Sequence, residues 1–185
     1  DGVLAAADWD SFSPQDRQLL LDPATLEVDD TGPVVVPDAE DGYRLSEREV
    51  RERGWGEVHA DSYGNLLLAL QMRLNQTFEF DDRNKKRLIR KHWKEVMACD
   101  PHKWGLREFE PLTEAHLEKH AKHFFPVYCV GYCWLDDCDI SARRLEQRIV
   151  SIMDSWKKAM RRCDKVILVT HSMGGIDACS LSSGV

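Results

Sequence analysis

The chain has 185 residues, and its 25 Lys and Arg against 32 Asp and Glu give a formal net charge of −7. This acidic balance argues against nucleic-acid binding, which typically uses a basic surface. Hydrophobic residues make up 43% and charged residues 31%, so the chain resembles a globular domain that can bury a core. No apolar run approaches the roughly 18 residues of a membrane span.

The cysteines do not form a metal-binding pattern. No two of them are spaced as CxxC, which argues against a zinc cage, and we expect no metal or cofactor site. Their even number is compatible with disulfides, although free buried thiols are the simpler interpretation. The six are Cys99, Cys129, Cys133, Cys138, Cys163 and Cys179.

Residues 1–60 are rich in Asp, Pro and Gly and predict only short elements. A Ser-Pro pair at Ser13 indicates the start of a short helix ending near Leu21. The apolar run 34–36 lies between two prolines and predicts at most an edge strand. Ser46 and Glu49 have the spacing of a capping box, and they begin a helical turn that Gly54 closes.

The middle of the chain predicts three helices. The first begins near Asp61 and carries apolar residues at three- and four-residue steps. Residues 83–98 predict a basic amphipathic helix within a helical insertion or cap at 83–111. The third runs from about Thr113 to Lys122. The apolar face of the first helix comprises Tyr63, Leu66, Leu67, Leu70 and Leu74.

The last third predicts an α/β architecture. The apolar run 127–132 is typical of a strand buried on both faces, and a second such run follows at 166–169. A helix from Ser141 to about Arg161 separates them, with Leu145, Ile149, Ile152, Met153 and Trp156 on its inner face. A strand, a helix and a strand at this spacing predict a right-handed parallel crossover.

The second strand leads directly into Thr-His-Ser-Met-Gly-Gly, where the chemistry is expected. A serine is an effective nucleophile when a sharp strand-to-helix turn exposes it to a base and to backbone N–H donors. We therefore predict Ser172 as the nucleophile and the N–H of Met173 as half of the oxyanion hole. Gly174 and Gly175 provide the small residues that such a turn needs. The alternative is that Ser172 only caps a helix.

His171 precedes the predicted nucleophile, and its side chain should point away from Ser172. We expect it to pack against or orient the turn rather than to act as the general base.

The run 166–175 resembles the nucleophile elbow of α/β-hydrolase lipases. Together with 53–64, 125–127 and 131–135, the sequence is similar to bacterial lipase-like proteins related to GPI inositol-deacylases. This group includes type VI secretion phospholipase effectors. The resemblance covers roughly 20–175 and implies a cofactor-free serine hydrolase that cleaves ester bonds of lipids or phospholipids. It also implies secretion into the periplasm of a target cell and a cognate immunity protein, with a cytoplasmic location as the alternative.

The family pattern is incomplete in these residues. In α/β-hydrolases the acid and the histidine follow the serine, but no histidine follows Ser172, and Asp177 is too close to serve as the acid. We expect residues 1–185 to be the N-terminal portion of a mostly parallel hydrolase sheet with flanking helices, 165–175 forming the strand and elbow. The C-terminal remainder of the same protein would then carry the Asp and His.

Other patterns favour simpler interpretations. His116, His120 and His123 share a helix face, but no carboxylate or cysteine joins them at ligand spacing, so a solvated polar face is favoured over a metal site. The three acids of the loop after 127–132, Asp136, Asp137 and Asp139, are interpreted as surface residues rather than a calcium loop. The basic helix is either an ordinary cationic face or a surface for anionic lipid headgroups or an acidic protein.

Two classes of function remain open from the sequence. The first is a lipolytic serine hydrolase acting through Ser172. The second is a non-catalytic fragment of hydrolase fold that serves as a protein-binding module. A downstream Asp and His in hydrolase order would favour the enzyme.

Overall fold

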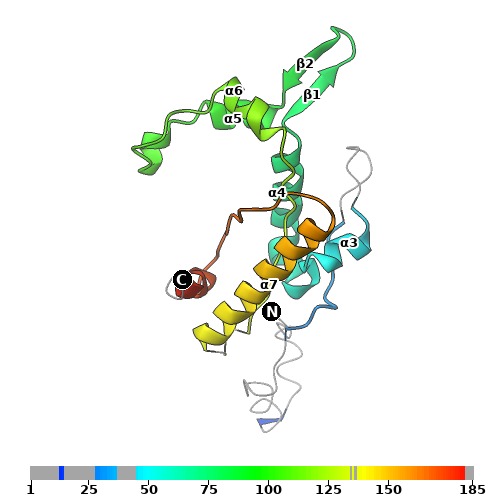
Figure 1. The fold of residues 1–185 in the computed structure, drawn as a ribbon, viewed down its shortest axis with the longest axis vertical. Coiled ribbons are helices and arrows are strands. Elements are labelled where there is room, and N and C mark those ends of the chain that lie inside the picture. The colour runs from blue at the N-terminus through cyan, green and yellow to red at the C-terminus, as the bar shows by residue number, and fades with distance from the viewer. Residues whose placement is uncertain (1–12, 15–27, 37–44, 134, 136, 182–185) are drawn as a thin grey trace.

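The computed structural model describes residues 13–14, 28–36, 45–133, 135 and 137–181 (Figure 1). The predicted helix that begins at Ser13 lies almost entirely outside these residues. The helical elements before the hairpin are α3 (Glu47–Glu52), η2 (Trp55–Glu57), η3 (Ala60–Gly64) and α4 (Asn65–Asn75). They are followed by β1 (Phe78–Asp81), β2 (Lys86–Ile89), α5 (Lys91–Met97), η4 (Pro101–Trp104), α6 (Glu114–His120), α7 (Cys138–Lys158) and α8 (Gly174–Leu181).

The capping box predicted at Ser46 is present and begins α3. The Ser46 hydroxyl accepts the Glu49 N–H at 3.2 Å, and the Glu49 carboxylate accepts the Ser46 N–H at 2.8 Å. These bonds satisfy N–H groups that a helix start otherwise leaves unpaired. Gly54 follows the helix with a φ of +81°, in the left-handed region that favours glycine. The start and the end of this helix are therefore confirmed.

A small core lies where the first helices meet the extended segment 127–131. Leu45, Val50, Trp55 and Leu67 are buried there, with Val127 and other apolar residues packed against them. Two glycines allow the backbones to approach closely. A Cβ at Gly54 would collide with the Cys129 carbonyl oxygen, and one at Gly131 would collide with the Glu57 carbonyl oxygen. Side chains at these positions would push the segments apart.

Helix α4 confirms the predicted core helix, and of the predicted apolar face only Leu66 is exposed. Leu67 and Gln71 are its buried residues, whereas Leu66 is 49% exposed. Gln71 is a buried polar residue that the apolar pattern did not predict. The Gln71 side-chain oxygen accepts hydrogen bonds from the Val127 N–H and from Arg53, each at 2.9 Å. The buried Gln71 amide binds the backbone of Val127, as the carbonyl group of a neighbouring strand would. The spacing of apolar residues does not predict such a contact.

Asn75 repeats this arrangement one turn later on α4. Its side chain donates to the Phe125 carbonyl oxygen and accepts the Phe125 N–H, both at 2.8 Å. Two amide side chains at i and i+4 therefore bind the backbone of 125–127.

The helix predicted over 83–98 is wrong in its first half. Residues 78–89 form the antiparallel hairpin β1–β2, with Phe78 opposite Ile89 and Asp81 opposite Lys86. The Asp81 carboxylate accepts the N–H groups of Arg83 and Asn84, which stabilises the hairpin turn. The 83–111 segment is therefore not helical throughout; its helical parts are α5 and the short turn η4.

The hairpin, α5, η4 and α6 form an arm, residues 78–123, that projects from the end of α4 (Figure 1). Arg87 stabilises this arrangement. Its guanidinium lies 3.6 Å from the centre of the Phe78 ring and donates to the Glu118 carboxylate on α6 at 2.9 Å. Helix α6 itself is confirmed, with Thr113 as its N-cap.

The long helix predicted from Ser141 is confirmed as α7, which begins three residues earlier. The Asp137 side chain caps it by accepting the Asp139 N–H at 3.0 Å. Asp137 therefore has a structural role within the acidic loop. The predicted inner face is the partly buried face of the helix, with Leu145 and Trp156 among its residues.

The strands predicted at 34–36, 127–132 and 166–169 are not formed in the described part of the chain, whose only sheet is the β1–β2 hairpin. A buried parallel strand needs neighbours for its backbone groups. Segment 127–131 instead bonds to side chains and to the Arg53 carbonyl oxygen. Ile167 and Val169 are 76% and 73% exposed, so no described element covers the second run. The parallel crossover therefore stays a prediction.

Candidate active site

The turn at Ser172 connects the segment 161–171, which has no helix or strand, to helix α8. Ser172 is exposed and has a φ of +55°, in the left-handed region. This conformation is uncommon for a residue with a Cβ and is typical of functional turns that the surrounding structure stabilises. Its carbonyl oxygen accepts the Gly175 N–H at 3.1 Å, which begins the turn of α8.

Gly174 and Gly175 begin α8, as expected for small residues after the turn. A Cβ at Gly174 would lie 3.7 Å from the Tyr132 ring, and one at Gly175 would lie 3.6 Å from the Thr170 hydroxyl. Both are ordinary contact distances, so the described residues leave room for alanine. The Tyr132 ring lies beside Gly174 at this turn.

The backbone of Met173 lies where α8 begins. The first N–H groups of a helix have no partner within the helix, and they point toward any anion placed at its N-terminus. This position is the one required of an oxyanion donor next to Ser172. The side chain of Met173 is 37% exposed and is not needed for that role.

His171 is held by Tyr63, a contact that the sequence did not predict. The Tyr63 hydroxyl lies 2.9 Å from Nδ1 of His171, and the two rings meet edge to face. Tyr63 belongs to η3, the π-helical turn before α4. The only sequence signal for this contact is that Tyr63 falls within one of the segments that resemble the lipase-like family.

No described histidine is hydrogen-bonded to Ser172. His171 is paired with Tyr63, and Nδ1 of His59 lies 2.9 Å from the Ser62 hydroxyl. The pair of His102 and Asp100 lies in the arm. Among the described residues, the turn therefore presents a serine and backbone donors but no relay of acid and base.

A second contact that the sequence did not predict connects the core to α7. The Glu57 carboxylate, only 10% exposed, accepts the Gly131 N–H at 3.0 Å and a hydrogen bond from Arg144 at 3.3 Å. Arg148 adds a longer ion pair at 4.0 Å. Glu57 therefore holds segment 127–131 against α7. Tyr132 follows this segment directly in the chain.

Cys129 lies beside this ion pair. Burial, followed by the charge of Glu57, raises the pKa of its thiol to about 11. A thiol with a raised pKa is a poor nucleophile and a poor metal ligand at neutral pH. All six cysteines are free.

The two histidines of α6 and His123, three residues beyond its end, use their rings for local contacts. His116 caps the helix with Thr113, Nε2 of His120 lies 2.7 Å from the Leu74 carbonyl oxygen, and Nδ1 of His123 lies 2.9 Å from that of Lys119. Among the described residues no three side chains of the metal-ligating types come together. None of the described helices is long and apolar enough to cross a membrane.

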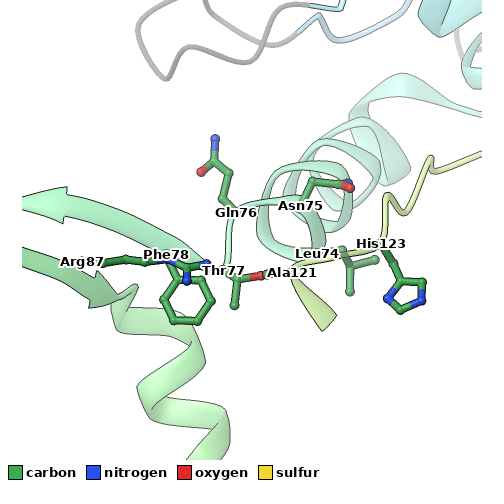
Figure 2. Close-up of a pocket in the computed structure, with 8 residues that line it drawn as sticks. All are labelled: Leu74, Asn75, Gln76, Thr77, Phe78, Arg87, Ala121 and His123. Carbon is green, nitrogen blue, oxygen red and sulfur yellow. The ribbon is translucent and has the colours of Figure 1, made fainter. Parts of the chain in front are cut away.

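Two hollows of the described structure lie away from Ser172. One of about 320 Å³ lies where α4 meets the hairpin, between Leu74, Thr77, Arg87 and His123 (Figure 2). Another of about 370 Å³ lies between α3 and α7, beside Tyr128. Neither includes Ser172.

Comparison with known proteins gives one informative result. No family model and no curated protein sequence matches this chain. In structure, the chain is similar to a chain of the crystal structure of the Tle4–Tli4 complex, with a TM-score of 0.78 and 30% sequence identity. The match covers 95% of this chain and 34% of the other, so this chain spans about a third of that protein's length. It supports a Tle4-like fold for these residues.

Proposed function

We propose that this chain is part of a serine hydrolase that cleaves ester bonds of lipids or phospholipids. The observation that carries the proposal is the conformation of Ser172, an exposed serine at positive φ directly before a helix that starts with two glycines. This matches the turn and helix of a nucleophile elbow, in which a strand precedes the turn. The Tle4-like fold and the sequence resemblance to type VI phospholipase effectors support the same function.

In this proposal the Ser172 hydroxyl attacks the ester carbonyl carbon while a general base takes its proton. The negative oxygen of the tetrahedral intermediate accepts a hydrogen bond from the Met173 N–H. The alcohol leaves with a proton from the same base, and water then hydrolyses the acyl-enzyme. The base and its acid are a His and an Asp that we assign to the C-terminal remainder of the protein.

The biological setting follows from the same resemblance. We propose that the protein is an antibacterial type VI effector that acts in the periplasm of a target cell. A cognate immunity protein is the expected partner, since the similar structure is itself a complex of two proteins, Tle4 and Tli4.

The test is hydrolysis of a soluble short-chain ester and labelling by a fluorophosphonate probe, with the full-length protein. Ser172→Ala should lower the rate by about a thousandfold or more and abolish labelling, because the nucleophile is lost. Ser151 is an exposed serine of α7, and Ser151→Ala is the matched control. This control should change neither the rate of hydrolysis nor the labelling by the probe. Full activity of Ser172→Ala would refute the assignment, and an inactive, unlabelled wild type would favour the non-catalytic binding module.

Met173 offers an independent test of the backbone donor. Met173→Ala keeps the N–H and should retain most of the activity, whereas Met173→Pro removes the N–H and should lower kcat by about a hundredfold. Equal activity of the two variants would contradict the proposed oxyanion contact.

A further inference from the structure

Two features of the turn at Ser172 need support from outside the turn. Ser172 has a φ of +55°, and a residue with a Cβ keeps this conformation only when surrounding contacts stabilise it. Helix α8 then begins with Gly174 and Gly175, and glycine is a weak helix former because it loses more backbone freedom than other residues do. The local sequence therefore does not fix the first turn of α8, on which the direction of the Met173 N–H depends.

Tyr132 contacts the start of α8. A Cβ at Gly174 would lie 3.7 Å from Cε1 of Tyr132 and 4.0 Å from its hydroxyl oxygen, so the outer end of the phenol ring faces this part of the helix. Gly174 has no side chain to hold the ring away from the helix backbone. Tyr132 is itself partly buried. The ring therefore packs against the first turn of α8.

The backbone that carries Tyr132 is held in place through the residue before it. The Gly131 N–H donates to the Glu57 carboxylate at 3.0 Å, and Arg144 of α7 donates to the same carboxylate at 3.3 Å. A Cβ at Gly131 would collide with the Glu57 carbonyl oxygen, so the two backbones are in close contact. The Tyr132 ring therefore extends from a backbone that is bound both to the core and to α7.

We propose that Tyr132 is a positioning residue for the turn of the proposed nucleophile. Its ring holds the first turn of α8 so that the Met173 N–H faces the oxyanion, and it acts through this turn rather than by contact with the substrate. Tyr63 contacts His171, which precedes Ser172, and the two tyrosines hold the turn at both ends. The inference rests on the proposed function and adds a residue to its site.

A displaced turn should lower kcat rather than weaken substrate binding. An oxyanion donor stabilises the transition state more than the bound ester, so its misplacement acts mainly on the chemical step. A displacement of about 1 Å can lower the rate by about a hundredfold. Loss of the Tyr132 ring should therefore change kcat and leave KM nearly constant.

The experiment measures hydrolysis of a soluble short-chain ester and the rate of fluorophosphonate labelling, with the full-length protein. Tyr132→Ala removes the ring and should lower both kcat and the labelling rate by about tenfold or more, with KM changed by less than about threefold. Tyr132→Phe keeps the ring, and its kcat should stay within about threefold of the wild type. Tyr132→Leu keeps an apolar side chain without the outer end of the ring, so it should lower kcat as Tyr132→Ala does and replaces that variant if it does not fold.

Tyr128→Ala is the matched control. Tyr128 lies four residues earlier in the chain, but its hydroxyl accepts the Trp156 N–H at 2.9 Å and so contacts α7 rather than the turn. Its loss should lower the melting temperature without changing kcat. The control therefore separates a general loss of stability from a displaced turn, and all variants are assayed at a temperature at which circular dichroism shows them to be folded.

Amide hydrogen exchange tests the same contact without any need for activity. Exchange in the peptide that spans 170–176 should become faster by about tenfold or more in Tyr132→Ala and should not change in Tyr128→Ala. Mass spectrometry of the peptides gives both values.

Hydrolysis by Tyr132→Ala at the wild-type rate, or unchanged exchange at 170–176, would overturn the proposal. A loss of kcat in Tyr132→Phe as large as that in Tyr132→Ala would assign the effect to the hydroxyl and overturn the role of the ring contact. A folded wild type that neither hydrolyses the ester nor reacts with the probe would instead refute the proposed function, and the exchange measurement would still decide whether Tyr132 holds the turn.

Discussion

The Tyr63 hydroxyl lies 2.9 Å from Nδ1 of His171, although 108 residues separate the two in the chain. The rings also meet edge to face, with centroids 5.9 Å apart. Because Ser172 follows His171 directly, this pair connects the turn before α4 to the turn that carries the proposed nucleophile. We infer that Tyr63 positions the turn of the proposed nucleophile without touching the substrate.

Replacing Tyr63 by Phe tests this positioning role. Tyr63→Phe removes the hydroxyl but keeps the ring, so kcat for a soluble ester should fall by about three- to tenfold while KM stays nearly constant. The melting temperature should change little, since one partly exposed hydrogen bond contributes only about 1 kcal/mol. Tyr63→Ala also removes the ring contact and should lower both kcat and stability. An unchanged kcat in Tyr63→Phe would contradict the inference.

The buried carboxylate of Glu57 should contribute substantially to stability. Glu57→Ala leaves the Gly131 N–H and Arg144 without their partner, and we expect the free energy of unfolding to fall by about 2–4 kcal/mol in urea denaturation. Glu52→Ala is the control. The Glu52 side chain is 65% exposed and pairs only loosely with Arg48, at 3.7 Å, so its loss should cost less than about 1 kcal/mol. Equal effects of the two substitutions would show that the Glu57 contacts are not important for stability.

The Cys129 thiol should make stability depend on pH in the alkaline range. Its pKa is raised from 9.0 to about 11 in the folded protein, mainly by burial, so the folded state holds this proton more tightly than the unfolded state. The resulting stability is fully present below pH 9 and is lost as the pH rises toward about 11, by up to about 2–3 kcal/mol. Cys129→Ala should flatten this part of the stability profile. Its profile is compared with that of the wild type by urea denaturation across this range, because other groups titrate there too.

The reactivity of the cysteines provides a second measurement. Cys99 and Cys179 are exposed and should react with iodoacetamide at pH 8 well before Cys129 does. Mass spectrometry of the alkylated peptides gives the order. Early modification of Cys129 in the folded protein would contradict its raised pKa.

Local interactions made several elements predictable from the sequence. The capping box at Ser46, the helix end at Gly54 and the helices that begin near Thr113 and Ser141 depend on contacts within about four residues, and the structure confirms them. The turn at Ser172 is also a local feature. Its sequence predicts a sharp turn, and the positive φ of Ser172 agrees with that prediction.

Tertiary contacts determined the features that local sequence patterns did not predict. Residues 83–90 have a helical pattern, but the stacking of Arg87 on Phe78 and its ion pair with Glu118 favour a hairpin. The pairing of Tyr63 with His171 and the burial of Gln71 and Glu57 join residues that are distant in the chain. Such contacts depend on how the backbone brings distant groups together, which periodicity and spacing along one segment do not encode. The strands predicted at 127–132 and 166–169 need ladder partners that are distant in sequence, and the described residues do not provide them.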